Sequence, residues 1–149
     1  MIEYSEKLRP SVGVYLVVAL TIPFFTLTLA PFSLPLGLSV GLLVFSGIAI
    51  SLHVTSPRIA VTTTTLRAGK AVIERAFVGS VSAYSGDAAR EQRGVKLDAR
   101  AWTLFRGFID PVVKVTLTDS SDPTPYWLIS TRNPQKLAHV LRAGRKSRE

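Results

Sequence analysis

Hydrophobic positions dominate one long stretch near the start of the chain, and no charged side chain interrupts it. Between Arg9 and Arg58 there is no Asp, Glu, Lys or Arg. Prolines divide this stretch at Pro31–Pro35, which leaves two apolar segments, at about residues 12–30 and 36–53. A helix of about nineteen residues extends roughly 28 Å, close to the ~30 Å hydrocarbon thickness of a bilayer. The pattern therefore predicts a transmembrane helical hairpin over residues 12–53.

Local details of the two apolar segments refine this prediction. Backbone groups in lipid must be paired within their own segment, so both spans should be helical. Pro23 should kink the first helix, with Thr26 and Thr28 able to bond to backbone carbonyls. Gly37 and Gly41 form a G-x-x-x-G spacing, which lets two helix backbones approach closely. Packing against the first span of the same chain is the favoured interpretation, and dimerisation is the alternative.

Charges on either side of the apolar segments predict the orientation. Lys7 and Arg9 precede the first span, Arg58 follows the second, and the connecting loop is uncharged. By the positive-inside bias, both termini of a multi-pass plasma-membrane protein then lie in the cytoplasm, with residues 1–11 as an N-terminal tail. A signal peptide cleaved near Ala30 and a buried hairpin of a soluble protein are the less favoured alternatives.

Beyond Pro57 the hydrophobic positions follow the pattern of short β-strands. A turn over Leu66–Lys70 should place Gly69 in a left-handed conformation. The polar stretch Asp87–Leu97 is expected to be irregular or helical. Tyr126 and Trp127 point to opposite faces of one strand, so at most one is expected in the core, with Trp127 favoured. The expected strands are Ile59–Thr63, Ala71–Ile73, Phe77–Tyr84, Ala101–Leu104, Val112–Thr118 and Tyr126–Ser130.

The C-terminal segment has the signals of an amphipathic helix. Asn133 suits the N-cap, Pro134 the first helical position, and Gly144 the end of the helix. Leu137, Val140 and Leu141 form one apolar stripe that needs a partner surface. The sequence thus predicts an α+β membrane protein. A small antiparallel sheet or open barrel over residues 57–144 would carry a C-terminal helix, followed by a basic tail at 145–149.

The charge of the chain is concentrated in this second part. Sixteen of the eighteen Lys and Arg residues and eight of the ten acidic residues follow Pro57, so cations outnumber anions by eight in this part of the chain. A basic domain tethered to a bilayer is attracted to anionic lipid headgroups, at about 1 kcal/mol per well-placed cation. We do not expect nucleic acid as the partner. Candidate anion contacts are Arg58, Arg67, Lys70, Arg75, Arg106 and Arg132.

Two of these candidates also have a structural interpretation. For Arg132, and in the same way for Arg106, an ion pair within the domain is favoured over an anion contact, for instance with Asp110 or Asp122. Catalytic chemistry is not indicated. The chain has no cysteine, His53 and His139 are far apart in sequence, and the carboxylates of Asp98 and Asp110 cannot be paired from sequence. We therefore expect no catalytic residue, no metal ligand and no cofactor.

Three stretches of the chain resemble a known family. They are Tyr4–Pro10, Leu66–Gly69 and, most specifically, Asp122–Pro134. They are similar to an uncharacterised actinobacterial family of two-span membrane proteins, classified as a domain of unknown function. The resemblance implies a membrane hairpin followed by a cytoplasmic domain like the bacterial pleckstrin-homology (PH) domains. It implies no activity, because the family has none assigned and fold does not determine function.

Three functional hypotheses follow. The first is a non-catalytic adaptor, in which the anchored domain binds a protein partner. The second is a module that binds anionic lipid headgroups through the cations near the anchor. The third is a small accessory subunit of a larger membrane complex, docked through Gly37 and Gly41.

Overall fold

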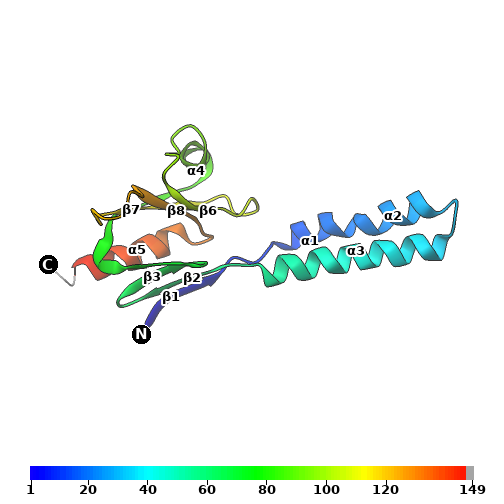
Figure 1. Cartoon of the computed structure of the whole chain (residues 1–149), viewed down its shortest axis with the longest axis horizontal. Coiled ribbons are helices and arrows are strands. Elements are labelled where there is room, and N and C mark those ends of the chain that lie inside the picture. The colour runs from blue at the N-terminus through cyan, green and yellow to red at the C-terminus, as the bar shows by residue number, and fades with distance from the viewer. Residues whose placement is uncertain (147–149) are drawn as a thin grey trace. The chain divides into compact units, whose positions relative to one another are not determined.

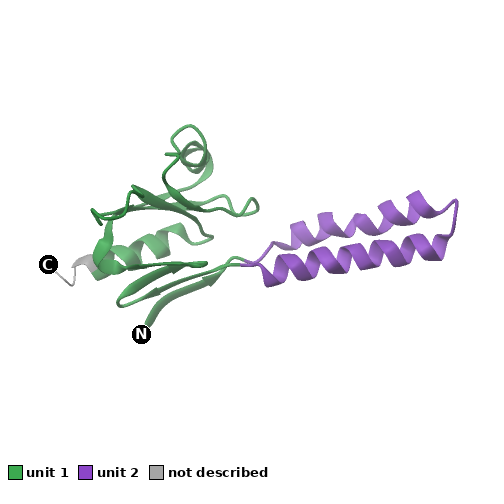
Figure 2. Ribbon diagram, viewed as in Figure 1, with its two compact units in different colours: residues 1–8, 57–149 green, residues 9–56 purple. Residues whose placement is uncertain are grey.

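The computed structural model describes residues 1–146 and divides the chain into two compact units (Figure 2). One unit, called the hairpin below, is Arg9–Ser56. The other, called the β domain, combines residues 1–8 with the chain from Pro57 onward. The hairpin is therefore inserted into the sequence of the β domain, between its first eight residues and the rest.

The hairpin consists of helices α1 (Val12–Ala19), α2 (Thr21–Leu29) and α3 (Leu34–Val54). Residues 12–29 and α3 are each long and apolar enough to cross a membrane. The loop between the two spans is shorter in the structure than the Pro31–Pro35 break expected from sequence. Pro35 lies in the first turn of α3, where a proline is tolerated. Ser33 caps this helix by accepting a hydrogen bond from the backbone N–H of Leu36 at 3.4 Å.

Helices α1 and α2 are separated at Leu20, within one turn of Pro23, at which the sequence predicts a kink. Proline has no N–H to donate to the carbonyl four residues earlier, which is that of Ala19, and its ring crowds that carbonyl. The two helices separate at Leu20 as a result. The hydroxyls of Thr26 and Thr28 donate to carbonyls one turn earlier, those of Ile22 and Phe24, and not to the carbonyl of Ala19 to which Pro23 cannot donate.

The first sheet of the β domain contains β1 (Ile2–Lys7), β2 (Arg58–Thr62), β3 (Thr65–Ala68) and β4 (Ala71–Glu74). The strands are antiparallel and adjacent in sequence order. Strand β1 corrects the prediction that residues 1–11 form a tail. Tyr4 and Leu8 are buried in this segment and pack in the main core, so burial of apolar surface stabilises it as a strand.

The turn after β3 is as predicted at Gly69, which has a φ of 61°. The residues before it are not part of the turn, however. Leu66 and Ala68 are fully buried while Arg67 is exposed, an alternation that defines a strand on a half-buried sheet. The segment expected to be a single turn is therefore a strand followed by a two-residue turn.

The second sheet contains β5 (Val78–Tyr84), β6 (Trp102–Leu104), β7 (Val112–Leu117) and β8 (Tyr126–Ser130). Its order is β5-β7-β8-β6, and β6 pairs with β8 in parallel, so the sheet is mixed rather than purely antiparallel. A short 3-10 helix, η1 (Arg75–Phe77), connects the two sheets. The polar stretch expected to be irregular or helical contains helix α4 (Gly86–Arg93).

Helix α5 (Pro134–Lys146) lies between the two sheets, as Figure 1 shows, and covers the main core. Leu137 and Leu141 are buried and Val140 is half-buried, which confirms the predicted apolar stripe. The first intrahelical bond runs from the N–H of Leu137 to the carbonyl of Asn133, as expected for an N-cap. Gly144 does not end the helix, which continues to Lys146.

A second, smaller core lies on the other face of the second sheet, beneath α4. Ala89 of α4 packs there with Val112, Tyr126 and Leu128, while Trp127 packs in the main core. Tyr126 and Trp127 are therefore both buried, at 6% exposure each. The prediction that only one of the two could be in a core was wrong, because α4 covers the face of the second sheet on which Tyr126 lies.

Candidate functional site

The carboxylate of Glu6 connects the first strand to the start of the last helix. It accepts hydrogen bonds from the hydroxyl of Tyr4 at 2.6 Å and from that of Thr131. Its other oxygen accepts from the backbone N–H of Arg132 at 2.9 Å. The hydroxyl of Thr131 also accepts from the backbone N–H of Asn133 at 3.1 Å. One carboxylate thus fixes the backbone that leads into α5.

This junction joins two of the three stretches that carry the family resemblance. Glu6 belongs to Tyr4–Pro10, and Thr131 and Arg132 to Asp122–Pro134. Burial, and then the hydrogen bond to Glu6, raise the pKa of the Tyr4 phenol to about 12, so the phenol stays protonated as a donor. The polar residues Tyr4, Glu6 and Thr131 in these stretches therefore have a structural use.

Arg75 is buried and takes no part in an exposed cationic surface, unlike the expectation from sequence. Its side chain is 3% exposed and forms an ion pair with Glu3 of β1. The guanidinium also donates to the carbonyl of Thr62 at 2.9 Å and to that of Val140 in α5 at 2.6 Å. Arg75 thereby ties the first sheet to the last helix, and it is removed from the set of candidate headgroup contacts.

Gly144 makes room for this buried guanidinium. A Cβ at this position would lie 1.9 Å from Nη2 of Arg75, far inside van der Waals contact. A glycine within a helix costs about 1 kcal/mol relative to alanine. The glycine that the sequence presented as a helix end is thus better explained by close packing.

Three of the six candidate cations gather at one end of the first sheet, together with a fourth that sequence analysis had not selected. Lys7 pairs directly with Arg58. Arg67 pairs with Ala60, which lies two residues after Arg58 and therefore on the same face of β2. Residues paired in antiparallel strands share a face, so these three cations lie on the exposed face of the sheet. Lys70 is in the adjoining turn, where the N–H of Gly69 donates to the carbonyl of Arg58 at 2.8 Å. We call Lys7, Arg58, Arg67 and Lys70 the cationic end.

Two acidic residues, Glu3 and Glu74, are at the opposite end of the same sheet, while Glu6 lies next to Lys7 but is engaged in the junction with Thr131 and Arg132. Glu74 pairs with Thr65 at the far end of β3, and Glu3 lies at the far end of β1. Within residues 1–146, no ion pair or side-chain hydrogen bond involves any of the four side chains of the cationic end. Arg58, Arg67 and Lys70 are exposed and Lys7 is half-buried. The sheet is therefore polarised, with unneutralised positive charge at one end.

Arg106 and Arg132 lie elsewhere. Arg106 is half-buried, and its backbone N–H donates to the hydroxyl of Ser130 at 3.3 Å. Arg132 is exposed at the start of α5, beside Glu6. Of the two acidic partners suggested for Arg132, Asp110 forms an ion pair with Arg93, and Asp122 accepts a hydrogen bond from the backbone N–H of Thr124. The backbone N–H of Gly86, and then the Arg93 guanidinium, hold the pKa of Asp110 below its ordinary value.

In the hairpin, Gly37 and Gly41 face α2 of the same chain. A Cβ on Gly37 would lie 2.8 Å from Cα of Thr26, and one on Gly41 would lie 2.8 Å from Cα of Ile22. Such contacts are shorter than real Cβ atoms allow, so both glycines are needed for the close approach of α2 and α3. The G-x-x-x-G face is therefore occupied within the chain.

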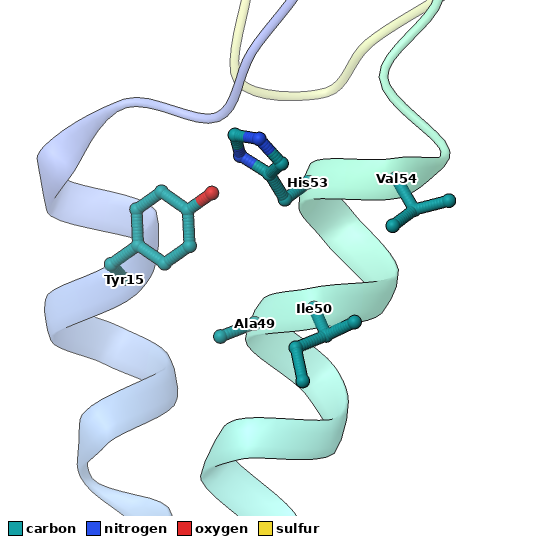
Figure 3. A pocket seen from close by; sticks show the side chains of 5 residues that line it. All are labelled: Tyr15, Ala49, Ile50, His53 and Val54. Atoms are coloured by element: carbon teal, nitrogen blue, oxygen red, sulfur yellow. The ribbon is translucent and has the colours of Figure 1, made fainter.

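An open groove of about 310 Å³ lies at the end of the hairpin where α1 begins and α3 ends (Figure 3). The phenol of Tyr15 on α1 points toward the imidazole of His53 on α3, above the apolar side chains of Ala49 and Ile50. A phenol and an imidazole over an apolar lining are typical of side chains at a membrane–water boundary. The groove is shallow and open to its surroundings.

There is no cluster of three His, Asp or Glu residues among residues 1–146 that could hold a metal ion. Asp98 and Asp110, the carboxylates weighed from sequence, are each paired with a separate arginine, Arg100 and Arg93. The residues of greatest interest are therefore the Glu6 junction, which is structural, and the cationic end, which is exposed.

Fold and site together define a small α+β protein, in which a long apolar helical hairpin is inserted between two paired strands of a polar, basic domain. The chain belongs to the family described as "Protein of unknown function (DUF3093)", whose model matches residues 3–141. No curated protein and no solved structure matches the chain. The family match covers the hairpin and the β domain alike.

Proposed function

We propose that this protein is a non-catalytic integral membrane protein of the plasma membrane. Its hairpin crosses the bilayer twice and holds the β domain at the cytoplasmic surface as an adaptor. The observation that carries the proposal is the pairing of β1 with β2. These strands precede and follow the hairpin directly, and they pair from Ile2 with Thr62 to Lys7 with Arg58.

This pairing restricts how the chain can lie in a membrane. Two strands hydrogen-bonded to each other must be in the same compartment. A hairpin that crosses twice satisfies this condition, whereas a single crossing would separate β1 from β2. Cleavage near Ala30 would remove β1 and, with it, the Glu6 junction and the ion pair of Glu3 with Arg75. The structure thus argues against a cleaved signal peptide.

The surface of the hairpin argues against a soluble protein. In helices α1, α2 and α3, which are described in full, Gly37 and Gly41 are the buried residues. Large apolar side chains such as Leu16, Phe24 and Leu43 are more than 60% exposed. An apolar surface this extensive is costly in water and is typical of contact with lipid. The polar backbone of each helix is paired internally, as a membrane requires.

Charge supports the cytoplasmic orientation. Lys7, Arg9 and Arg58 flank the open ends of the helices, and the loop at residues 30–33 has no charge. Positive residues near the ends of a span favour the cytoplasmic side. The open end of the hairpin and the β domain would then be cytoplasmic, with the short loop on the other side.

The role as an adaptor is inferred from the architecture of the β domain. Two packed sheets with a C-terminal helix between them support the proposed PH-like fold, although the fold alone does not determine what the domain binds. The actinobacterial origin that the resemblance implies stays a prediction. The alternative of an accessory subunit docked through Gly37 and Gly41 is weakened, because α2 fills that face. Binding of lipid headgroups is treated below.

Fractionation and a pull-down test the two parts of this proposal. The full-length protein should stay in the membrane pellet after alkaline carbonate extraction, because apolar helices rather than charge hold it there. Release into the supernatant would refute the anchor. Under mild detergent, affinity purification should return a partner at a constant ratio to the protein. Purification of the protein alone across several detergents would refute the adaptor role.

A further inference from the structure

We infer that the cationic end of the β domain binds the anionic headgroups of the leaflet in which the hairpin is anchored. The inference deepens the proposed function and rests on the hairpin being in the membrane. Its site is Lys7, Arg58, Arg67 and Lys70, defined by the strand register rather than by sequence proximity. The occupant is the anionic membrane surface itself.

The first argument is the cost of the arrangement. Lys7 and Arg58 are directly opposite each other in neighbouring strands, and like charges in that position destabilise a sheet. Among residues 1–146, neither side chain has an acidic partner. Arg67 is on the same face of the next strand, opposite Ala60, which lies two residues after Arg58. The charge of Arg67 adds to the repulsion. Anions supplied from outside the chain would remove this cost.

The second argument is the distance to the membrane that the chain itself imposes. Lys7 is five residues before the start of α1 at Val12, and Arg58 is four residues after the end of α3 at Val54. At most about 3.6 Å per residue, an extended chain places both cations within roughly 18 Å of the helix ends. This upper limit follows from the length of the connecting chain alone and holds for every orientation of the β domain.

The third argument is the polarity of the sheet. The turn with Lys70 adjoins Arg58, and the acidic residues Glu3 and Glu74 are at the opposite end of the strands. An anionic surface near the hairpin would attract the first group and repel Glu74, whereas the charge of Glu3 is neutralised by Arg75. Val72, which pairs with Arg67 and is 49% exposed, adds an aliphatic side chain to the same face. A few cations around an exposed aliphatic residue suit the boundary between headgroups and acyl chains.

Fluorescent labels can test this contact in the intact protein, because the chain has no cysteine. Val72→Cys marks the cationic end, Thr64→Cys marks the opposite end of the same sheet, and Phe24→Cys marks the hairpin. Each full-length variant would carry an environment-sensitive fluorophore in nanodiscs of phosphatidylcholine alone or mixed with phosphatidylglycerol. Quenching by a nitroxide on the lipid headgroup reports contact with the surface, and quenching by an acyl-chain nitroxide reports insertion.

We expect the Val72→Cys label to be quenched by the headgroup nitroxide in anionic nanodiscs, and much less in neutral ones. Raising salt from ~0.1 M to ~1 M should reverse the effect, because the screening length falls from about 10 Å to about 3 Å. The Thr64→Cys label should respond weakly in both. Arg58→Gln should reduce the docked-to-undocked ratio about fivefold, as expected for one well-placed cation. Lys136→Gln removes an exposed cation of α5 and should leave the ratio unchanged.

The controls separate the inference from the proposed function. If the Phe24→Cys label is not quenched by the acyl-chain nitroxide, the anchor itself is refuted. If it is quenched, but the Val72→Cys label responds equally in neutral and anionic nanodiscs, only the headgroup contact is refuted. Equal losses from Arg58→Gln and Lys136→Gln would also overturn it, since attraction would then depend on net charge rather than on this site.

Discussion

The carboxylate of Glu6 accepts a hydrogen bond from the backbone N–H of Arg132 at 2.9 Å, although 126 positions of sequence separate the two residues. The strand before the hairpin thereby fixes the start of the last helix. Arg75 makes a second connection of the same kind, between Glu3 and the carbonyl of Val140. The first eight residues are consequently an integral part of the β domain, and the hairpin interrupts that domain.

Glu6→Gln should destabilise the β domain. The amide retains one acceptor oxygen but loses the charge that strengthens the bonds from Tyr4, Thr131 and Arg132. Hydrogen bonds to charged groups contribute about 1.5–3 kcal/mol each, so we expect a loss of about 2 kcal/mol or more in unfolding free energy. Both tryptophans, Trp102 and Trp127, are in the second sheet, so denaturation followed by tryptophan emission in detergent reports this domain.

The matched control for this prediction is Glu91→Gln. Glu91 pairs with Lys96 on the surface, where solvent screens the two charges and the pair contributes little to stability. A change of similar size in the two variants would contradict the special role of Glu6.

Replacing the hairpin with a short flexible linker should yield a soluble, folded β domain. The N–H of Leu8 donates to the carbonyl of Pro57 at 2.9 Å, so the two residues are opposite each other at the end of the β1–β2 ladder. Because Pro57 has no N–H to close a two-residue β-turn, a linker of a few Gly and Ser residues suits this connection. We expect this variant to show cooperative unfolding of its tryptophan emission, whereas residues 57–149 alone should not, because they lack β1. Equal stability of the two proteins would show that β1 is dispensable.

Gly144→Ala should destabilise the protein even though alanine favours a helix by about 1 kcal/mol. The added methyl group would collide with the buried guanidinium of Arg75 and disturb its bond to Val140. We expect a net loss of about 1–3 kcal/mol, typical of overpacking. Gly107→Ala is the control, since a Cβ there meets no atom within 4 Å. A stabilised Gly144→Ala variant would refute the packing role of this glycine.

Stability should fall at alkaline pH through Tyr4. Burial and the hydrogen bond to Glu6 raise the pKa of the phenol from an ordinary 10.0 to about 12, so the folded state binds this proton more tightly. The resulting stabilisation is complete below pH 10 and is lost as the pH rises from 10 to 12. Tyr4→Phe should be less stable at neutral pH and less sensitive to pH over this range. Parallel pH profiles of the two proteins would contradict the assignment.

Much of the fold follows directly from the sequence, because the relevant signals are local. The helices of the hairpin, the break caused by Pro23, the turn at Gly69 and the strands of the second sheet all depend on short-range patterns. The N-terminal strand could not be predicted in this way. Six residues before an apolar segment have no local signal that shows which strand they pair with, and the partner is on the far side of the hairpin.

The candidate contact residues show the same limit, because tertiary pairing decides which of them are exposed. Arg58, Arg67 and Lys70 could be selected as cations near the anchor, but only the register with β1 adds Lys7 to the same face. Arg75 was indistinguishable from them in sequence, because its burial depends on Glu3 and on the helix that follows much later. Tertiary pairing therefore decides which cations are exposed and which are structural.

The most direct test of the central claim is the accessibility of single cysteines in intact cells. Phe32→Cys marks the loop of the hairpin, where the native side chain is 84% exposed, and Thr64→Cys marks an exposed turn of the β domain. A membrane-impermeant maleimide should label Phe32→Cys in intact cells and Thr64→Cys only after permeabilisation. Labelling of Thr64→Cys in intact cells, or protection of both positions until permeabilisation, would contradict a hairpin that crosses the membrane twice with the β domain in the cytoplasm.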